Sequence, residues 1–312
     1  MPILSLQMLS LIASIFMQCS SNCLANLDNV YNMVSYTPLA LGNIDTTEAL
    51  LKPWSLACQS NTGGTVTVPQ GRFLVNTVTF QGPCNGPMTF NVNGILKAPI
   101  TPSTGEDHWI LFANVDGLTI SGKGVFDGQG PIAWSICKNG ASCPRRPASL
   151  KFNSVKNAKI EGISSINNNF FHFNIFGCEN FNVNGDDFIS LGPGITNINI
   201  SSIISGPGHG ISIGSLRGSL GEPPVRGIIV YDSTITVNDV ENPIIIDHNY
   251  CPHGSCGRQD GGSQVRISNV KFINIKGKSA SEDSQIPTKA TRSNFYGTFY
   301  GSQVPQRCMN IA

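Results

Sequence analysis

Cys178-Glu179-Asn180-Phe181-Asn182-Val183 is one copy of a six-residue pattern that recurs along this chain of 312 residues. Each copy has an apolar residue, two residues that are polar or glycine, a second apolar residue, any residue and a third apolar residue. A turn followed by a short strand, with side chains alternating between two faces, produces this pattern. The other copies are Val115-Asp116-Gly117-Leu118-Thr119-Ile120, Val155-Lys156-Asn157-Ala158-Lys159-Ile160, Ile195-Thr196-Asn197-Ile198-Asn199-Ile200 and Val225-Arg226-Gly227-Ile228-Ile229-Val230.

Short strands that resemble one another, with no helical pattern between them, predict a solenoid. A Greek-key sandwich would also explain short strands, but it would not explain a recurring motif. The abundance of asparagine favours an all-β parallel β-helix, in which asparagine side chains stack and left-handed turns recur at the corners of successive coils. The asparagines that indicate such corners are Asn167 to Asn169, Asn197, Asn199, Asn269 and Asn274.

One helix is predicted, from Thr46 to Gln59, with Asp45 or Thr46 as its N-terminal cap. Its apolar residues Leu50, Leu51, Trp54 and Ala57 are spaced to face a core. Because the end of a solenoid exposes sheet edges, we expect this helix to cover the N-terminal end.

The composition is typical of an extracellular β protein, with 12% charged residues, 33 glycines and 19 prolines. The length fits one large domain. A net charge of +1 gives no basic surface for nucleic acid, so we expect no nucleic-acid partner. A polyanionic substrate would have to be met by local cations.

Residues 1–25 are predicted to be a signal peptide, with an apolar run from Met1 to Met17 and cleavage after Ala25. The run is short for a membrane anchor, no other segment could span a bilayer, and no membrane association is expected. Residues 26–282 are expected to form the β-helix and residues 283–312 an irregular C-terminal tail.

Eight cysteines remain after cleavage and imply disulfides in an oxidising compartment, with Cys137/Cys143 and Cys251/Cys256 as close pairs within loops. One sequon, Asn199-Ile200-Ser201, permits glycosylation.

Two glycine-rich stretches carry the candidate chemistry: Gly185-Asp186-Asp187 and Gly206-Pro207-Gly208-His209-Gly210. They lie one repeat apart, so stacking would bring Asp187 and His209 together. An acid and a carboxylate that activates water are what glycosidic cleavage requires, and the glycines, Gly208 and Gly210 among them, let the backbone approach a ligand closely. Taken singly, the aspartates could form an ordinary Gly-Asp turn or a calcium site, and His209 could be a loop residue without a role.

These stretches, together with Ile211-Ser212-Ile213-Gly214-Ser215-Leu216 after the histidine, resemble plant polygalacturonases, which are pectin-cleaving glycoside hydrolases. The resemblance runs from about Val30 to Glu282, with gaps, and Val78-Thr79-Phe80-Gln81-Gly82-Pro83-Cys84 is similar to the exo-acting, pollen-type branch. Further stretches that carry it are Gly94-Ile95-Leu96-Lys97-Ala98-Pro99, Gly122-Lys123-Gly124-Val125-Phe126-Asp127-Gly128-Gln129-Gly130 and Pro243-Ile244-Ile245-Ile246-Asp247-His248-Asn249-Tyr250-Cys251-Pro252.

The resemblance implies a right-handed parallel β-helix of the pectin-lyase-like class and inverting hydrolysis of α-1,4-galacturonan, with no metal and no cofactor. On that basis Asp186 matches the general acid, Asp187 one of the carboxylates that activate water, and His209 the histidine that supports the acid. We expect a secreted monomer that acts on pectin in the cell wall.

Two motifs of the family are absent. An Asn-Thr-Asp motif, whose aspartate is the third catalytic carboxylate, should precede Gly185, but Val183 is followed directly by Asn184 and Gly185. An Arg-Ile-Lys motif, which binds the substrate carboxylate, should follow Val237, but the chain passes directly to Asn238. A pair of cysteines that the family bonds to each other is replaced by Phe188 and Ser205.

Whole segments have therefore been lost between repeats, and the β-helix is expected to be shortened. A solenoid tolerates such losses because each coil contacts only its neighbours. Catalysis tolerates them less well, since removing one carboxylate of a coupled set costs orders of magnitude in rate. Arg217 and Arg226 are candidates to replace the lost cation.

Two hypotheses follow: a secreted polygalacturonase, or a catalytically impaired or dead pectin-binding homologue. A calcium-dependent pectate lyase, the third alternative, would need a carboxylate cluster with a catalytic arginine, and no such cluster is evident.

Overall fold

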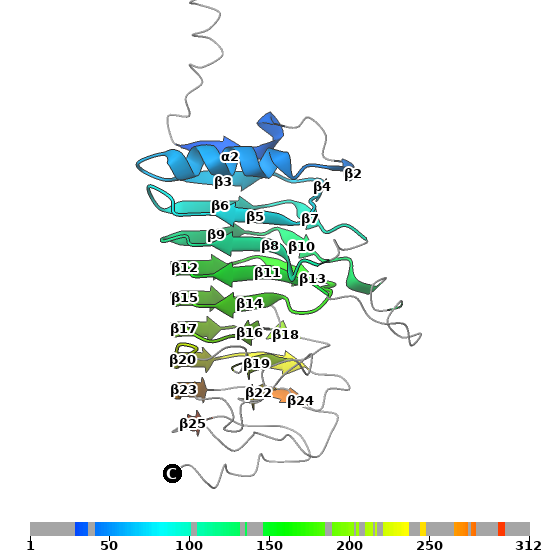
Figure 1. Cartoon of the computed structure of the whole chain (residues 1–312). Helices are drawn as coiled ribbons and strands as arrows, with labels where there is room; N and C mark the ends of the chain where they lie inside the picture. Colours follow the sequence, from blue (N-terminus) through cyan, green and yellow to red (C-terminus); the bar gives the residue numbers. More distant parts are fainter. Residues whose placement is uncertain are drawn as a thin grey trace, which may run out of the picture.

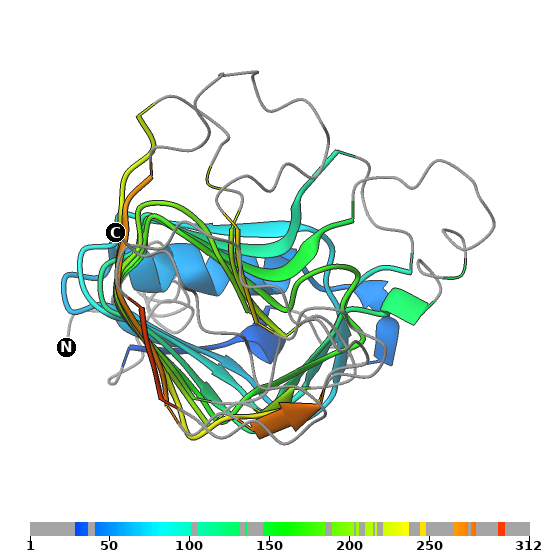
Figure 2. The same ribbon diagram turned by 90° about the horizontal axis from the view of Figure 1, so that it is seen from below.

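The computed structural model describes residues 29–36, 41–100, 105–131, 135, 146–184, 189–202, 204–205, 210–214, 216, 221–236, 244–247, 265–273, 276–278 and 293–296. Within these ranges the chain winds into a parallel β-helix. Figure 1 shows its strands stacked along one axis, and Figure 2, along that axis, shows the strands superposed in walls around a common interior. All of the strand pairs are parallel, which excludes the sandwich and confirms the solenoid.

The longest wall is a ten-stranded sheet. In spatial order it contains β1 (Val30–Asn32), β3 (Gly64–Val68), β6 (Met88–Val92), β9 (Leu118–Gly122), β12 (Lys156–Glu161), β15 (Glu179–Asn184), β17 (Thr196–Ser201), β20 (Val225–Tyr231), β23 (Ile267–Ile273) and β25 (Ser293–Tyr296).

The second wall is divided into two sheets. The five-stranded sheet contains β2 (Leu41–Asp45), β4 (Arg72–Leu74), β7 (Ile95–Lys97), β10 (Val125–Asp127) and β13 (Ser164–Ile166). The three-stranded sheet contains β18 (Ile204–Ser205), β21 (Thr234–Thr236) and β24 (Lys276–Lys278).

The third wall is a seven-stranded sheet, and it matters most for function. In spatial order it contains β5 (Val78–Gln81), β8 (His108–Ala113), β11 (Ala148–Asn153), β14 (Phe173–Phe176), β16 (Ile189–Leu191), β19 (Ile211–Gly214) and β22 (Ile244–Asp247).

The five copies of the six-residue pattern form adjacent strands of the ten-stranded sheet: β9, β12, β15, β17 and β20. Register aligns the last apolar residue of each copy in one buried column. The column consists of Ile120, Ile160, Val183, Ile200 and Val230. The pattern thus encodes one wall of the solenoid, one coil per copy.

Asparagines stack where the chain enters this wall, as predicted. Asn157, Asn180 and Asn197 have φ angles of 51°, 53° and 57°, in the left-handed region. Asn180 donates to the Oδ1 atom of Asn157 at 3.0 Å, and Asn197 donates to that of Asn180 at 3.1 Å. Asn167 and Asn269 also have positive φ. Asn168, Asn169 and Asn199, which the sequence also places at left-handed corners, do not, although Asn199 donates to the Oδ1 atom of Asn182 at 3.0 Å. Asn274 lies outside the described residues.

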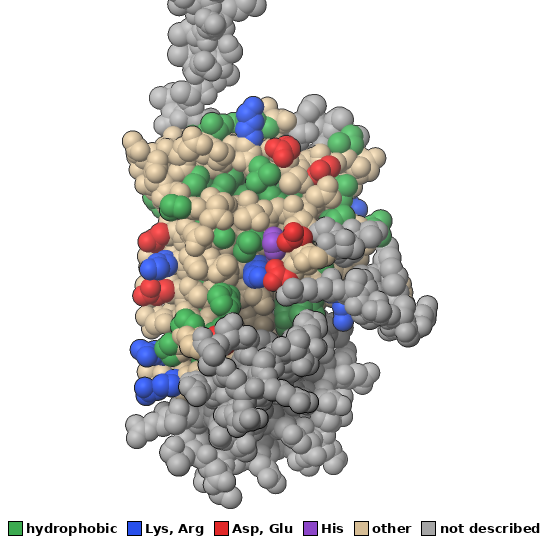
Figure 3. Space-filling view, in the orientation of Figure 1, with side chains coloured by type: hydrophobic (Ala, Val, Ile, Leu, Met, Phe, Trp, Pro, Cys, Tyr) green, Lys and Arg blue, Asp and Glu red, His purple; other side chains and the backbone are tan. Residues whose placement is uncertain are grey.

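The interior beneath the seven-stranded sheet is aromatic in its upper coils. The rings of Phe80 and Phe112 are stacked 5.0 Å apart, and those of Phe112 and Phe152 are stacked 5.6 Å apart. In the lower coils the same column continues through aliphatic residues, Ile175, Leu191 and Ile213. Charged side chains are sparse on the face shown in Figure 3, where tan predominates among the described residues.

The predicted helix is α2 (Glu48–Gln59), which lies over the N-terminal end of the solenoid in Figure 1, after the 3-10 turn η1 (Met33–Ser35). Leu50, Trp54 and Ala57 are buried, and Leu51 packs against the same core while half-buried. The N-cap is Thr47, so neither predicted cap, Asp45 or Thr46, is correct; Asp45 accepts a hydrogen bond from the backbone N–H of Thr47 at 2.9 Å. The helix therefore covers the end of the solenoid, as expected.

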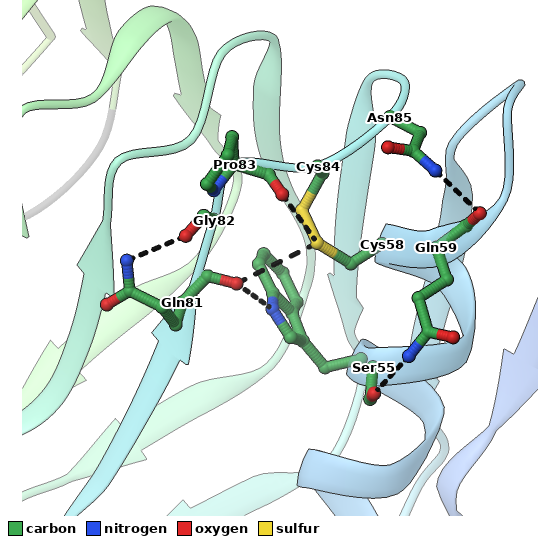
Figure 4. The surroundings of a disulfide bond; sticks show 9 residues. Ser55, Cys58, Gln59, Gln81, Gly82, Pro83, Cys84 and Asn85 are labelled. Carbon is green, nitrogen blue, oxygen red and sulfur yellow. Dashed lines mark hydrogen bonds between the residues drawn. A yellow bond between two sulfur atoms is a disulfide. The ribbon is translucent and has the colours of Figure 1, made fainter.

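A disulfide between Cys58 and Cys84 links the end of α2 to the turn after β5 (Figure 4). In the same region Asn85 donates to the backbone oxygen of Gln59 at 2.9 Å. Cys178 departs from the expectation of disulfides, because it is a free cysteine buried in the core, where burial raises the pKa of its thiol to about 12. The pairs Cys137/Cys143 and Cys251/Cys256 lie outside the described residues.

Within residues 283–312, for which an irregular tail is predicted, the described residues Ser293–Tyr296 form β25 and pair with β23. None of the helices in the described part of the chain reaches the length and hydropathy required to cross a bilayer.

Candidate functional site

A polar stripe runs along the outer face of the seven-stranded sheet. Register places Lys151, Asn174, Ser190 and Ser212 side by side on four successive strands, β11, β14, β16 and β19. Their neighbours in each strand point into the core, so these four side chains face outward. The stripe follows the solenoid axis and crosses the coils that carry both glycine-rich motifs.

The described residues beside those motifs lie next to one another. Asn184 ends β15 and Ile189 begins β16; Gly210 precedes Ile211, which begins β19. Ile189 and Ile211 are paired in register.

Asp186, Asp187, Gly208 and His209 lie outside the described residues. Gly210 is buried and has a φ of 72°, a left-handed conformation that favours glycine.

An ionic cluster adjoins the stripe at β8 and β11. The Nζ atom of Lys151 donates to the Oδ2 atom of Asp107 at 2.6 Å, and the Nδ1 atom of His108 lies 3.1 Å from the Oδ1 atom of Asp107. Glu106 lies at 3.9 Å from the same Nδ1 atom. In Figure 3 acidic and basic side chains gather around a histidine on this face. The sequence pointed to none of these residues, although a lysine between Leu150 and Phe152 in an alternating strand must face outward.

The cluster lowers the pKa of Asp107 well below its usual range. The hydrogen bond with His108 is the largest influence, burial opposes it, and the hydrogen bond and charge of Lys151 lower the pKa further. A carboxyl group whose pKa is depressed by folding stabilises the fold above its unfolded pKa of about 3.9, and that stabilisation is lost as the pH falls below this value.

We therefore expect Asp107→Asn to be less stable than the parent at about pH 5 and the difference to shrink as the pH falls to about 2.5. Guanidinium unfolding at several pH values measures this. Glu106→Gln, at a neighbouring side chain that is 53% exposed, is the control and should change the pH dependence less. A difference between parent and Asp107→Asn that stays constant over this range would contradict the assignment.

The loop between β13 and β14 is held by buried polar side chains. The Nδ1 atom of His172 lies 2.8 Å from the Oγ atom of Ser165. Asn169 donates to the backbone oxygen of Gly128 at 3.0 Å. A Cβ atom at Gly130 would lie 2.2 Å from the backbone oxygen of Asn168, so only glycine permits this approach. The stretch Asp127-Gly128-Gln129-Gly130, which contributed to the resemblance, thus holds adjacent coils together.

The coil of β15 and β16 is unusually short. Hydrogen-bonded asparagines of successive coils are 23 residues apart from Asn157 to Asn180, but only 17 apart from Asn180 to Asn197. Other coils place a strand of the second wall between the ten-stranded and seven-stranded sheets, such as β13 between β12 and β14. No described residue intervenes between β15 and β16, and residues 185–188 span the connection. The second wall is divided into its two sheets at this coil.

Of the two candidate cations, Arg226 lies on β20 of the ten-stranded sheet, a different wall from the stripe, and Arg217 lies outside the described residues. Among the described residues, no cluster of three or more histidine, cysteine, aspartate or glutamate side chains could hold a metal ion.

The family model for glycosyl hydrolases family 28 matches residues 58–184, 182–237 and 229–295. The chain belongs to glycosyl hydrolases family 28. It is 32% identical over 368 residues to an exopolygalacturonase from Platanus acerifolia, a match that covers 89% of this chain and 97% of the relative. It is 36% identical over 309 residues to an exopolygalacturonase from Zea mays, covering 78% and 75%. A polygalacturonase from Nicotiana tabacum is 35% identical over 319 residues, covering 82% and 79%.

Solved structures share the fold at low identity. The family 28 exopolygalacturonase of Yersinia enterocolitica superposes with a TM-score of 0.57 at 15% identity, covering 86% of this chain and 59% of that one. The exopolygalacturonase of Thermotoga maritima gives a TM-score of 0.55 at 17% identity, covering 81% and 69%.

The breaks in the family match fall where the family 28 motifs are missing. The first two matched segments meet at residues 182–184, directly before Gly185, and the last two meet at residues 229–237. The alignment with the Platanus relative is also longer than this chain of 312 residues. The chain is therefore a family 28 glycosidase with internal segments missing, one of them at the short coil.

Proposed function

We propose that this protein acts on pectin as a polygalacturonase that hydrolyses α-1,4-linked galacturonan with inversion. Asp186 is the general acid, Asp187 activates the attacking water, and His209 supports the acid. Gly208 and Gly210 allow the backbone to approach the sugar closely. The reaction needs neither metal nor cofactor.

The observation that carries the proposal is the pairing of Ile189 with Ile211. Asp187 lies two residues before Ile189, and His209 lies two residues before Ile211. Paired parallel strands lie about 4.8 Å apart, so the two motifs lead into neighbouring strands on adjacent coils. A carboxylate pair and a histidine would then border the polar stripe, where an extended polysaccharide crosses successive coils.

Lys151 favours an acidic substrate. Its ammonium group is held by Asp107 and lies in the same stripe, two strands from Ser190. An ammonium group has three donors, so the hydrogen bond with Asp107 leaves others for a ligand carboxylate.

The short coil favours a second candidate function, the binding of galacturonan with little or no hydrolysis. The third carboxylate of the family, in its Asn-Thr-Asp motif, has no counterpart in the sequence, and the break in the family match falls at the same point. A carboxylate missing from a coupled catalytic set lowers the rate by orders of magnitude while leaving much of the binding surface in place.

We further propose that the protein is a secreted monomer of the cell wall. Residues 1–25 have the character of a signal peptide. The Cys58–Cys84 disulfide supports passage through an oxidising compartment.

The experiment is to express residues 26–312 in a secretory host and to measure reducing ends released from polygalacturonic acid. Asp186→Asn should lower the rate about 10²- to 10⁴-fold. Asp116→Asn, at an exposed aspartate beside the ten-stranded sheet, is the control and should leave it unchanged. Release that Asp186→Asn leaves intact would refute the assignment of the acid. A folded parent that binds oligogalacturonate without releasing reducing ends would establish the second function instead.

A further inference from the structure

The loop between β13 and β14 exposes a large aromatic side chain, Phe170. Its side chain is 40% exposed, and its ring centroid lies 4.0 Å from that of Phe171, with the two planes tilted by 51°. Among the described residues Phe176 is the other phenylalanine exposed to this degree, and the phenylalanines of the walls are mostly buried. An aromatic ring held at the surface beside a candidate site is a feature of ligand-binding surfaces.

The loop holds this ring in a fixed position. Asn168 donates to the backbone oxygen of Phe170 itself, and Asn169 donates to the backbone oxygen of Gly128 on the coil above. His172, on the other side of the two aromatic residues, contacts Ser165. Asn168, Asn169 and His172 are all buried, so the loop is anchored on both sides of Phe170.

The position of the ring relative to the catalytic segment follows from register. The ladder with β11 extends beyond the start of β14, because the backbone N–H of Ser149 donates to the oxygen of Phe171 at 2.8 Å. Phe173 pairs with Ile189 on the next coil. Phe171 lies two residues before Phe173. Asp187 likewise lies two residues before Ile189 in the sequence. The aromatic pair stands at the end of the seven-stranded sheet that leads toward the glycine-rich motifs, one coil away.

We propose that Phe170 is a stacking platform for one pyranose ring of the galacturonan chain, at a subsite one coil from the catalytic segment. The inference rests on the proposed function. A galacturonate ring has an apolar face of C–H groups that packs on a flat aromatic ring, while its carboxylate projects from the edge. Lys151, on the neighbouring strand β11 and in register with Asn174, provides a cation on the outer face of the same sheet.

The short coil determines how many coils separate this loop from the connection between β15 and β16. In a relative that keeps the additional segment before Gly185, a further coil would separate the equivalent loop from the catalytic aspartates. In this chain that segment is absent, and the loop between β13 and β14 lies on the coil next to the one that contains β15 and β16. The platform would contribute affinity that does not depend on the missing carboxylate.

The test is calorimetric titration of trigalacturonate into the protein in an Asp186→Asn background, which prevents turnover. We expect Phe170→Ala to weaken the Kd about tenfold, as expected for the loss of a stacked aromatic surface. Phe170→Trp should keep the Kd within about threefold of the parent, because it preserves a flat ring. The matched control is Phe176→Ala: Phe176 is 41% exposed on the opposite end of β14, and its removal should leave the Kd within about twofold.

Equal losses in Phe170→Ala and Phe176→Ala, or no loss in Phe170→Ala, would overturn the platform while leaving the proposed function standing. No binding of trigalacturonate by the folded parent would overturn the platform and the proposed function together. Unchanged guanidinium midpoints in the Phe170 variants would show that affinity, rather than folding, has been altered.

Discussion

Phe152→Ala should lower the free energy of unfolding by about 4 kcal/mol, within the range for removing a buried phenylalanine. Phe152 is fully buried in the middle of the solenoid. Its ring is stacked on that of Phe112 at 5.6 Å and meets that of Phe181 edge-on at 4.9 Å. It therefore joins β8 of its own wall to β15 of the ten-stranded wall, and the cavity left by alanine could be filled only by moving both.

Guanidinium unfolding followed by circular dichroism measures this loss. Phe176→Ala is again the control, because Phe176 lies on the next strand but is 41% exposed, and it should cost about 1 kcal/mol or less. Similar losses in the two variants would mean that the aromatic column does not hold the coils together. In a solenoid each coil is stabilised by its neighbours, so a defect at Phe152 should also reduce the cooperativity between the upper and lower coils.

The sequence predicts five strands of the ten-stranded wall, β9, β12, β15, β17 and β20, because each belongs to a six-residue copy with a turn and three apolar positions. Alternation places Ile160 and Val183 inside, and the left-handed turns at Asn157 and Asn180 set where each strand begins. Strands of the second wall, such as β10 and β13, are three residues long, too short for an alternating pattern to distinguish them from loops.

The ionic cluster could not be predicted because coil length varies. Lys151 and Asp107 are 44 residues apart. In the polar ladder, by contrast, Asp116 and Asn157 are 41 residues apart, and the asparagines that follow are 23 and then 17 residues apart. Without a constant repeat, sequence spacing does not give the register that brings two such side chains together.

Cys178 shows a different limit. Cysteine count alone suggested disulfides, but this cysteine occupies the first apolar position of its six-residue copy and is buried as a small hydrophobic side chain.

Restoring the missing coil should raise the rate of galacturonan hydrolysis about 100-fold, near the lower end of what a positioned acid or base contributes. The insertion belongs between Asn184 and Gly185, where the family match breaks and the coil is shortest. The donor is the corresponding segment of the Platanus exopolygalacturonase, whose alignment with this chain is longer than the chain itself. A parallel β-helix accepts a whole coil because the added strands pair with β15 above and with the next coil below.

The rate of reducing-end release at saturating polygalacturonic acid measures the effect. An insert that carries an Asn-Thr-Asp motif is compared with a matched insert in which the aspartate of that motif is changed to asparagine. The two inserts restore the same backbone, so only the carboxylate distinguishes them. If the intact insert raises the rate and the asparagine version does not, the lost carboxylate limits this chain. If both raise it equally, the short coil acts by misplacing Asp186 and Asp187, and the missing carboxylate is not the cause. If neither raises it although both fold, the loss of the Arg-Ile-Lys segment after Val237 becomes the limiting change, because the substrate carboxylate would still lack its cation.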